Sequence, residues 1–484
     1  MRDFTPTTAS ASDRRRGRAR PLLALLVLAA AAALALITLR VGPEPEIALE
    51  PARPGIGPAT PVAVAVSAGG RGLGEVRLEL HQEGRPPRVL VRREHEPRPA
   101  WAFWGPRTTE EAFETEVGGR TVEGLAEGEA TLRVVAERAP TWLRRPDPAV
   151  EEVTLPVRLS PPSLAVLSSQ HYATQGGSGV VVYRAGEGSE RSGVAAGEHW
   201  FPGFPLPGAD GDEPAGGGGR AGGKSFAFYA VPYDLDDPAR VRLVAEDALG
   251  NRAERAFLDI FKPHPYAEGT IELSDGFMAR VVPEILSESP GFRERGDLLA
   301  TYLAINGEMR EANAAELREL GETSRQELLW EGAFVPLPNG QVMSPFAEHR
   351  AYRYGGENVD EQFHLGYDLA SVRRAPVPAA NSGVVALAEY LGIYGNTVVV
   401  DHGYGLTSLY GHLSEIAVEP GQQVARGETL GRTGETGLAG GDHLHFAILL
   451  QGLPVDPVEW WDPAWVRDRV LAKLEAESAV RGGG

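Results

Sequence analysis

Three stretches decide how this 484-residue chain folds: FHLGYDLA at residues 363–370, SLYGHLS at residues 408–414 and GDHLHFAILL at residues 441–450. Short apolar runs bounded by glycines, as in these stretches, are typical of buried β-strands. The segment that the stretches span contains five of the eleven histidines, namely His364, His402, His412, His443 and His445. This concentration predicts a site in which imidazoles take part in the chemistry.

The spacing of four of these histidines brings them together with one aspartate. Side chains two residues apart in a strand point to the same face, so His443 and His445 project together. His364 and Asp368 are four residues apart, and the glycine between them permits a tight bend. Two imidazoles and one carboxylate would make an open catalytic zinc site with water as the fourth ligand. That arrangement leaves two histidines free for proton transfer. His412 follows an apolar run at the kind of strand end where an imidazole can reach a cleft.

The three stretches are specific only in combination. A single H-x-x-x-D or H-x-H is usually a surface or structural feature, whereas all three stretches in this order within a strand-rich region favour a metal site. The sequence has no H-E-x-x-H pattern, which would supply a glutamate as general base. We therefore expect histidines to move the protons.

In these segments the sequence resembles the lysostaphin-type zinc endopeptidases, also called LytM or beta-lytic peptidases, which cut the peptide part of bacterial peptidoglycan. The resemblance covers about residues 342–461. Further segments follow in the family's order: SPF (344–346), GVV (383–385), GNTVVVDHG (395–403), VEPGQQV (418–424), TG (433–434) and PVDP (454–457). The resemblance implies an antiparallel β peptidase domain with a groove for an extended peptide, which we place at residues 341–463.

The resemblance also implies roles for individual residues. His364, Asp368 and His445 match the zinc ligands, with one Zn²⁺ per chain. His412 and His443 match the two catalytic histidines that do not bind the metal.

Other residues of this region receive weaker assignments. His402 matches a family residue without a catalytic role, so we expect it to be structural, and we expect His349 and Arg350 only at the rim of the groove. After the aspartate, Ser371-Val-Arg-Arg374 stands where the family usually has a small polar, glycine-rich turn. This departure leaves the substrate preference open.

Composition excludes several classes of function. The net charge of −19 and the pI near 5.1 argue against nucleic acid as a partner, because a phosphate-binding surface needs a basic excess. Cysteine is absent, which excludes disulfides, thiolate metal sites and cysteine nucleophiles. Any metal must therefore be bound by histidine and carboxylate.

The N-terminal residues indicate export. Five arginines between residues 14 and 20 precede an uncharged Ala/Leu-rich run at residues 22–39, and glutamates follow it. This charge order predicts a cytoplasmic basic tail (1–21), a transmembrane signal anchor (22–39) and a linker (40–61), with the bulk of the chain on the periplasmic or cell-wall side. As a helix the run rises ~27 Å, enough to span a membrane with slight thinning. A cleaved signal peptide is the alternative, but its hydrophobic region would be shorter than this run, about 7 to 15 residues.

Residues 62–262 predict two tandem immunoglobulin-like β-sandwiches, at 62–160 and 161–262. Short alternating strands are separated there by Gly- and Pro-rich turns. A faint repeat supports the division, because Val134-Val-Ala-Glu-Arg-Ala139 aligns with Leu243-Val-Ala-Glu-Asp-Ala248. The fold is thus expected to be mainly β, and the sandwiches could bind envelope partners.

Residues 263–340 change to a helical period and predict a helical linker region, which either spaces the domains or covers the active-site groove. Residues 464–484 are expected to form a C-terminal tail.

Three hypotheses about the function remain. The first is a membrane-anchored zinc metalloendopeptidase that hydrolyses peptidoglycan stem peptides or cross-links. The second is a non-hydrolytic activator of other cell-wall hydrolases that uses the same groove. The third is a scaffold whose sandwiches bind partners, but it leaves the histidines unexplained. The presence of all five site residues favours the enzyme.

Overall fold

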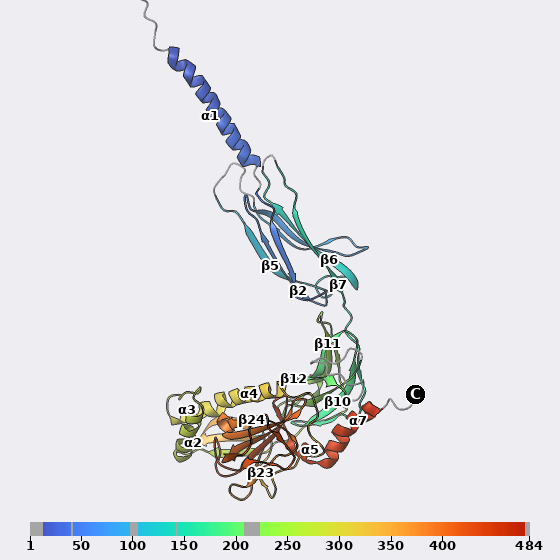
Figure 1. The fold of residues 1–484 in the computed structure, drawn as a ribbon, viewed down its shortest axis with the longest axis vertical. Coiled ribbons are helices and arrows are strands. Elements are labelled where there is room, and N and C mark those ends of the chain that lie inside the picture. The colour runs from blue at the N-terminus through green and yellow to red at the C-terminus, as the bar shows by residue number, and fades with distance from the viewer. Residues whose placement is uncertain (1–12, 40–41, 97–104, 142–143, 208–222, 480–484) are drawn as a thin grey trace, which may run out of the picture. The chain divides into compact units, whose positions relative to one another are not determined.

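The computed structural model describes residues 13–39, 42–96, 105–141, 144–207 and 223–479 (Figure 1). The chain divides into two compact units. The first comprises Met1–Ser160 with Ala248–Asn251, and the second comprises Pro161–Asp247 with Arg252–Gly484.

Near the N-terminus, Asp13–Leu39 form one 27-residue helix, α1, which contains the predicted anchor at residues 22–39. No helix in the described part of the chain combines the length and the apolar character that a membrane span requires. The anchor therefore stays a prediction. Residues 1–12 of the predicted basic tail lie outside the described residues.

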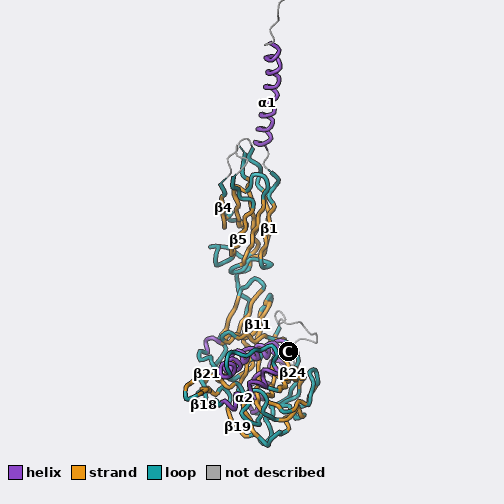
Figure 2. The backbone as a smooth tube through the Cα atoms, turned by 90° about the vertical axis from the view of Figure 1, so that its left-hand side faces the viewer, coloured by secondary structure: helices purple, strands orange, loops and turns teal. Residues whose placement is uncertain are grey.

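The first unit contains two antiparallel sheets that enclose one core. Their strand orders are β1-β2-β5 and β4-β3-β6-β7. Buried side chains such as Val62, Val64, Leu78 and Leu132 form one cluster, and along β2 they alternate with less buried ones, so the two sheets pack as a sandwich. Figure 2 shows the strands of this unit. The strands are β1 (Glu46–Pro51), β2 (Thr60–Ser67), β3 (Leu73–His81), β4 (Arg88–Glu94), β5 (Glu110–Val117), β6 (Gly128–Arg138) and β7 (Ala149–Val157).

Strand β1 corrects the predicted linker at residues 40–61. Glu46 to Pro51 pair with β2 along their whole length, and Ile47 and Leu49 pack against the core. The prolines that suggested a tether are compatible with this strand, because β1 lies at the edge of its sheet, where a missing N–H donor costs little.

The second unit begins with two further four-stranded sheets in the described residues, β13-β14-β10-β8 and β12-β11-β15-β16. The repeated segment lies in β6 of the first unit and in β15 here, and each is the third strand of its sheet. The elements are β8 (Leu164–Val166), β9 (Tyr172–Thr174), β10 (Ser178–Ala185), β11 (Ser189–Ala196), β12 (His199–Pro202), β13 (Phe204–Pro205), β14 (Lys224–Ala230), η1 (Pro238–Arg240), β15 (Val241–Asp247), β16 (Arg252–Arg255), β17 (Ile260–Lys262) and β18 (Glu268–Glu272).

The core of these sheets continues into the C-terminal region. Val180 and Phe226 belong to the same buried cluster as Leu406 and Trp460. The predicted boundary at residue 262 therefore does not separate two cores, and the C-terminal β region is packed against the second sandwich.

The helical segment is shorter than predicted, because β18 precedes it and pairs in parallel with β20. Ser274 caps α2 by accepting a hydrogen bond from Phe277 N–H, and the buried face of α2 packs on Tyr302. Helices α2 and α3 lie at one end of the second unit, and α4 runs from them toward β12 (Figure 1). The helices are α2 (Asp275–Glu288), α3 (Leu298–Ala304), η2 (Ile305–Met309) and α4 (Arg310–Glu322).

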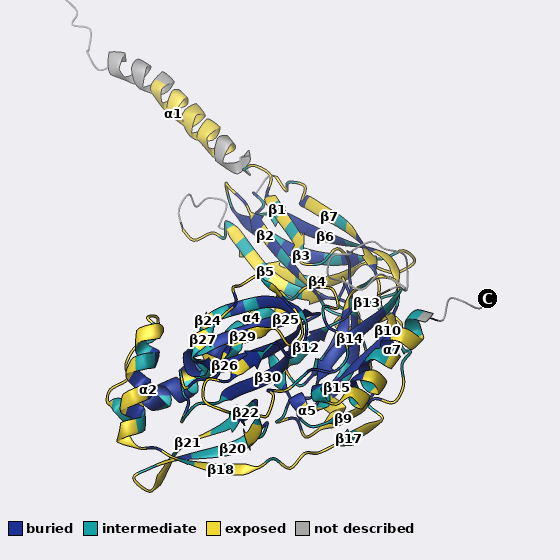
Figure 3. Ribbon diagram, turned by 60° about the horizontal axis from the view of Figure 1, so that its bottom comes forward, coloured by how far each residue is buried: buried dark blue, intermediate teal, exposed yellow. Residues whose placement is uncertain are grey.

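The C-terminal β region is organised around one eight-stranded sheet in the described residues, in the order β19-β22-β30-β26-β25-β24-β28 with β31 beside β30. Its central strands β26 and β30 are buried throughout, as Figure 3 shows. The elements are β19 (Gln341–Ser344), β20 (Glu348–Tyr354), β21 (Glu357–His364), β22 (Tyr367–Ala370), β23 (Pro376–Pro378), β24 (Gly383–Tyr390), η3 (Gly392–Tyr394), β25 (Asn396–Gly403), β26 (Leu406–Leu413), β27 (Glu415–Ile416), β28 (Gln423–Val424), β29 (Thr429–Arg432), β30 (Leu444–Leu450) and β31 (Leu453–Val455).

The predicted tail at 464–484 is corrected as well. Val466 and Val470 are fully buried, and Lys224 on β14 forms an ion pair with Glu477. An amphipathic C-terminal helix that buries its apolar face is docked rather than free. The helices are α5 (Pro457–Trp461), α6 (Pro463–Trp465), η4 (Val466–Leu471) and α7 (Ala472–Ala479), and residues 480–484 lie outside the described residues.

Candidate active site

Three neighbouring strands bring the predicted site residues together. Asp368 on β22 is the register partner of His445 on β30, and His445 is in turn opposite Gly411 on β26. His364 ends β21, one tight turn before β22, and His412 follows Gly411. The five predicted residues therefore meet because β30 lies between β22 and β26. This strand order cannot be predicted from local sequence.

The atoms of His364, Asp368 and His445 converge on one point. His364 Nε2 lies 2.9 Å from Asp368 Oδ1, His445 Nδ1 lies 3.0 Å from the same oxygen, and the two nitrogens are 3.0 Å apart. All three side chains offer donor atoms suited to one metal ion.

The hydrogen bonding of His364 supports a cation at this point. His364 Nδ1 lies 3.0 Å from the carbonyl oxygen of Pro345, which can only accept, so Nδ1 carries the proton in the neutral ring. Nε2 then presents a lone pair to the carboxylate of Asp368 at 2.9 Å. Two lone pairs at this separation require a proton or a metal ion between them. The residues present thus fit a metal held by two imidazoles and one carboxylate.

Gly366 allows the strands to approach this closely. A Cβ atom there would lie 2.6 Å from Cε1 and Nε2 of His445 and 2.8 Å from the carbonyl oxygen of Phe446. Real Cβ contacts are not this short, so only glycine fits between β21 and β22 without moving the imidazole.

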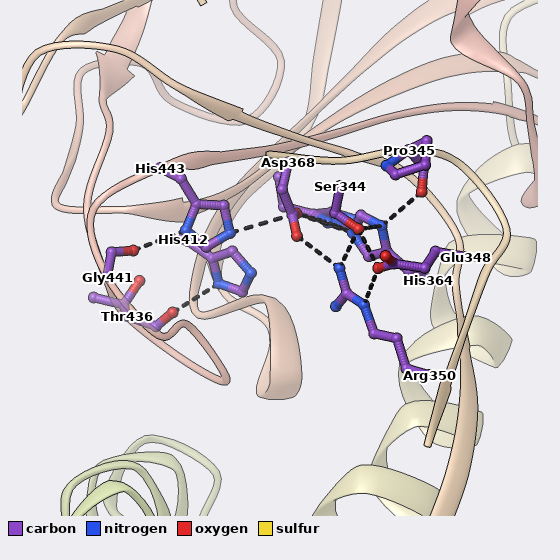
Figure 4. A network of polar contacts seen from close by, with 11 residues as sticks. Ser344, Pro345, Glu348, Arg350, His364, Asp368, His412, Thr436, Gly441 and His443 are labelled. Carbon is purple, nitrogen blue, oxygen red and sulfur yellow. Dashed lines mark hydrogen bonds and ion pairs between the residues drawn. The ribbon is translucent and has the colours of Figure 1, made fainter. Parts of the chain in front are cut away.

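His412 and His443 lie beside the three converging residues (Figure 4). Their ring centroids are 4.8 Å apart. The Nδ1 of His412 is 2.8 Å from the carbonyl oxygen of Thr436, and that of His443 is 2.8 Å from the carbonyl oxygen of Gly441. Each ring therefore keeps Nε2 for exchange of protons, and His443 Nε2 is 3.4 Å from Asp368 Oδ1.

The backbone of His412 is in the left-handed region, with φ of 61°. This conformation is uncommon outside glycine and is held only where the surrounding structure requires it. Because His412 lies near the end of β26 with its ring beside that of His443, the strain is consistent with a functional position.

The pKa shifts of the site residues indicate which of them are charged and which are neutral. Burial alone would raise the pKa of Asp368, but the surrounding imidazole groups of His364, His443 and His445 hold that pKa well below its usual value. Burial lowers the pKa of His445 to about 4, and burial together with the neighbouring histidines lowers the pKa of His412 far below its usual value. Although burial opposes it, contact with Asp368 raises the pKa of His443. An ionised carboxylate and neutral imidazoles are the states that bind metal ions.

Arg350, which the sequence placed only at the rim, lies inside the site. Its Nη2 donates to Asp368 Oδ2 at 3.0 Å, and its side chain is only 17% exposed. A signal was present in the sequence, because Glu348 and Arg350 are two apart on the strand that precedes His364 and so share one face. His349, the other residue expected at the rim, is partly exposed beside Glu361, and its rim position stays a prediction.

The site lines a cleft of about 600 Å³. One wall comes from the five histidine and aspartate positions, and the other comes from the segment that precedes the peptidase region: Gly269–Glu272, Phe277, Tyr302 and Arg310. Arg280 on α2 also donates to the carbonyl oxygen of Ala439 at 2.7 Å, next to the loop that carries His443. Residues of the region 263–340 thus line one side of the cleft, and the role predicted for it, spacing the domains or covering the groove, stays a prediction.

His402 is structural, as its context suggests. The ring is fully buried, with Nδ1 at 2.8 Å from the carbonyl oxygen of Ser382 and Nε2 at 2.8 Å from Ser408 Oγ. The segment Ser371–Arg374, where the sequence departs from the family, contacts the site indirectly, because Arg374 N–H donates to Asp442 at 3.0 Å, the residue before His443.

Comparisons with known proteins agree with this geometry. Residues 362–457 match Peptidase family M23. The chain is 37% identical over 123 residues to the DD-carboxypeptidase/endopeptidase Mpg of Neisseria meningitidis serogroup B, covering 25% of this chain and 27% of that protein. It is 38% identical over 165 residues to the peptidoglycan DD-endopeptidase ShyA of Vibrio cholerae, covering 34% and 35%.

A third relative is named as an activator of hydrolases rather than as an endopeptidase. The chain is 32% identical over 163 residues to the murein hydrolase activator EnvC of Escherichia coli K12, covering 32% of this chain and 39% of that protein. The chain therefore matches only 27% to 39% of the length of these three relatives. From the converging histidines and aspartate and from the matched sequence, residues 362–457 are a peptidase domain of family M23, the LytM type.

Proposed function

We propose that the chain is a zinc metalloendopeptidase that hydrolyses peptide bonds in peptidoglycan stem peptides or cross-links. The observation that carries the proposal is the convergence of His364 Nε2, Asp368 Oδ1 and His445 Nδ1 beside two further histidines in one cleft. The substrate class is supported by two relatives whose names describe endopeptidases, one of them of peptidoglycan.

His364, Asp368 and His445 would hold the zinc. Two neutral imidazoles and one carboxylate leave a zinc ion with a net positive charge and an open position, as in catalytic sites. When bound, the ion would polarise the scissile carbonyl and acidify a water molecule. Cysteine is absent from the chain, so thiolate ligation does not compete with this set.

His412 and His443 would carry the proton chemistry. Each ring is fixed through Nδ1 to a backbone carbonyl, so Nε2 is the atom that can take or give a proton. We assign to this pair a hydrogen bond to the developing oxyanion and delivery of a proton to the leaving amine. Both histidines line the same cleft as the three metal-site residues, which is the geometry that these roles require.

The alternative is an activator of other cell-wall hydrolases, and the similarity to EnvC is the observation that favours it. An activator uses the cleft to bind and needs no complete catalytic set. All five site residues are present here and brought together, which supports the enzyme.

A digestion experiment separates the two functions. The purified chain is incubated with peptidoglycan, with and without a chelator, and the soluble products are identified by mass. If the chain is the enzyme, we expect peptide fragments with new amino termini. These fragments should be absent when chelator is added or when His445 is replaced by alanine. If the chain is an activator, we expect no fragments from the chain alone, but faster digestion of peptidoglycan when a separate wall hydrolase is added.

We also propose that residues 22–39 anchor the chain in the cell membrane, with its bulk extracytoplasmic. The support is the five arginines before this run and the glutamates after it, and the substrate proposed above lies outside the membrane. The full-length chain should sediment with membranes, resist carbonate extraction and be released by detergent. Recovery of the full-length chain in the soluble cytoplasm would contradict the anchor.

A further inference from the structure

The two oxygens of Asp368 have different partners. Oδ1 faces His364 Nε2 at 2.9 Å and His445 Nδ1 at 3.0 Å, which is the proposed position of the metal. Oδ2 points the other way and accepts a hydrogen bond from Arg350 Nη2 at 3.0 Å (Figure 4). The carboxylate is thus divided between a metal side and an arginine side.

Arg350 is itself held in place. Its Nε donates to Glu348 Oε2 at 2.8 Å, and its Nη2 also lies 2.6 Å from Ser344 Oγ. The side chains of Arg350 and Glu348 are 17% and 18% exposed, so water competes little for these bonds. A guanidinium is planar and its donors have fixed directions, so two carboxylates and a hydroxyl leave it one orientation.

The backbone explains why these groups meet. Ser344 on β19 is the register partner of Asp368, and Glu348 on β20 is the register partner of His364. The turn between β19 and β20 also gives Pro345, whose carbonyl oxygen fixes His364. The continuous segment from β19 to β20 therefore contacts two of the three predicted ligands, Asp368 through β19 and His364 through Pro345 and β20.

We propose that Arg350 is a positioning residue of the metal site, which occupies Oδ2 of Asp368 so that the carboxylate binds the metal through Oδ1 alone. This inference rests on the proposed zinc site. A carboxylate without this partner can turn both oxygens toward the metal and fill the position that a water molecule or a substrate carbonyl needs. Arg350 thereby keeps one coordination position open.

The test uses the full chain loaded with Co²⁺, whose visible absorption is stronger in four-coordinate than in five-coordinate sites. Arg350→Met should still bind about one cobalt per chain but absorb more weakly per bound ion. With zinc, its kcat for peptide release should fall about 10- to 100-fold, the usual effect of losing an outer partner of a ligand, with KM little changed.

Two further variants make the result specific. Arg350→Lys keeps the charge but cannot bridge Glu348 and Asp368 with fixed geometry, so its absorption and kcat should lie between those of Arg350→Met and the unmodified chain. Arg467→Met is the control, because Arg467 on η4 is a 67% exposed arginine paired with Asp468 at 2.7 Å and does not line the cleft, and it should match the unmodified chain.

The outcomes distinguish this inference from the proposed function. If the unmodified chain binds no metal or releases no peptide, the proposed function fails. If the unmodified chain does both and Arg350→Met has the same absorption per bound cobalt, then Arg350 does not orient Asp368 and the inference is overturned. It is also overturned if the folded variants simply lose cobalt while each remaining ion absorbs as before, because that is a purely structural effect.

Discussion

Replacing Gly366 with alanine should damage the metal site through one methyl group. The added Cβ would lie 2.6 Å from two ring atoms of His445, whereas ordinary contacts begin near 3.4 Å. The imidazole would have to move by about 0.8 Å, or the turn between His364 and Asp368 would have to move instead. The carbonyl oxygen of Phe446 lies 2.8 Å from the added methyl group, so the methyl group cannot move away from the imidazole in that direction.

The size of this displacement sets the expected loss of affinity. Metal–ligand distances tolerate only about ±0.2 Å, so a shift four times larger removes or distorts one of three protein ligands. Losing even an outer partner of a ligand costs about 10- to 100-fold in metal affinity, and we expect at least this loss, which corresponds to about 1.4 to 2.8 kcal/mol. Competition between the chain and a chromophoric zinc chelator measures it directly.

A matched glycine provides the control. Gly276 lies in α2, and a Cβ added there meets nothing within 4 Å. Gly276→Ala should therefore bind zinc as the unmodified chain does and gain slight helix stability. Circular dichroism should show that both variants are folded. If folded Gly366→Ala binds zinc with unchanged affinity, His445 is not the ligand that the geometry indicates.

Three further outcomes are expected. His412→Ala and His443→Ala should each retain about one zinc per chain by elemental analysis and lose about 10²–10³-fold in kcat, and zinc loss in both would show that the ligands are misassigned. Chelation should lower the Tm measured by calorimetry by several degrees, because a ligand at 100 times its Kd stabilises the folded state by about 2.7 kcal/mol, and an unchanged Tm would argue against a specific site. Glu459→Gln should raise Tm at pH 8 and much less at pH 5. Burial raises the pKa of Glu459 to about 8, so the folded state keeps a proton that the unfolded chain releases above about pH 4.5, and stability is lost as pH rises toward 8. An equal gain at both pH values would contradict this explanation.

The sequence predicted those parts of the site that depend on local spacing. His443 and His445 share a face because they are two apart in an extended segment, and His364 and Asp368 converge across a glycine turn. The resemblance to a known family added the specific catalytic roles of His412 and His443. Each of these inferences needs only residues close in sequence or a pattern already known.

What could not be predicted depends on register between distant strands. Asp368 meets His445 because β22 pairs with β30, and Ser344 meets Asp368 because β19 pairs with β22. Arg350 was placed at the rim for this reason, since its spacing from Glu348 indicates a shared face but not that β20 passes behind the carboxylate. The docked helix near Val470 was missed similarly, because its apolar face identifies burial but not the surface that buries it.

The most direct test of the central claim is a zinc titration of peptide-bond cleavage. Metal-free chain is mixed with peptidoglycan fragments of known cross-linking and with increasing zinc, and the new amino termini are counted by mass. The proposed function predicts that cleavage rises with zinc up to about one ion per chain and then levels off, and that His445→Ala stays inactive at the same concentrations. Cleavage that is complete before zinc is added, or no cleavage at full zinc occupancy, would contradict it.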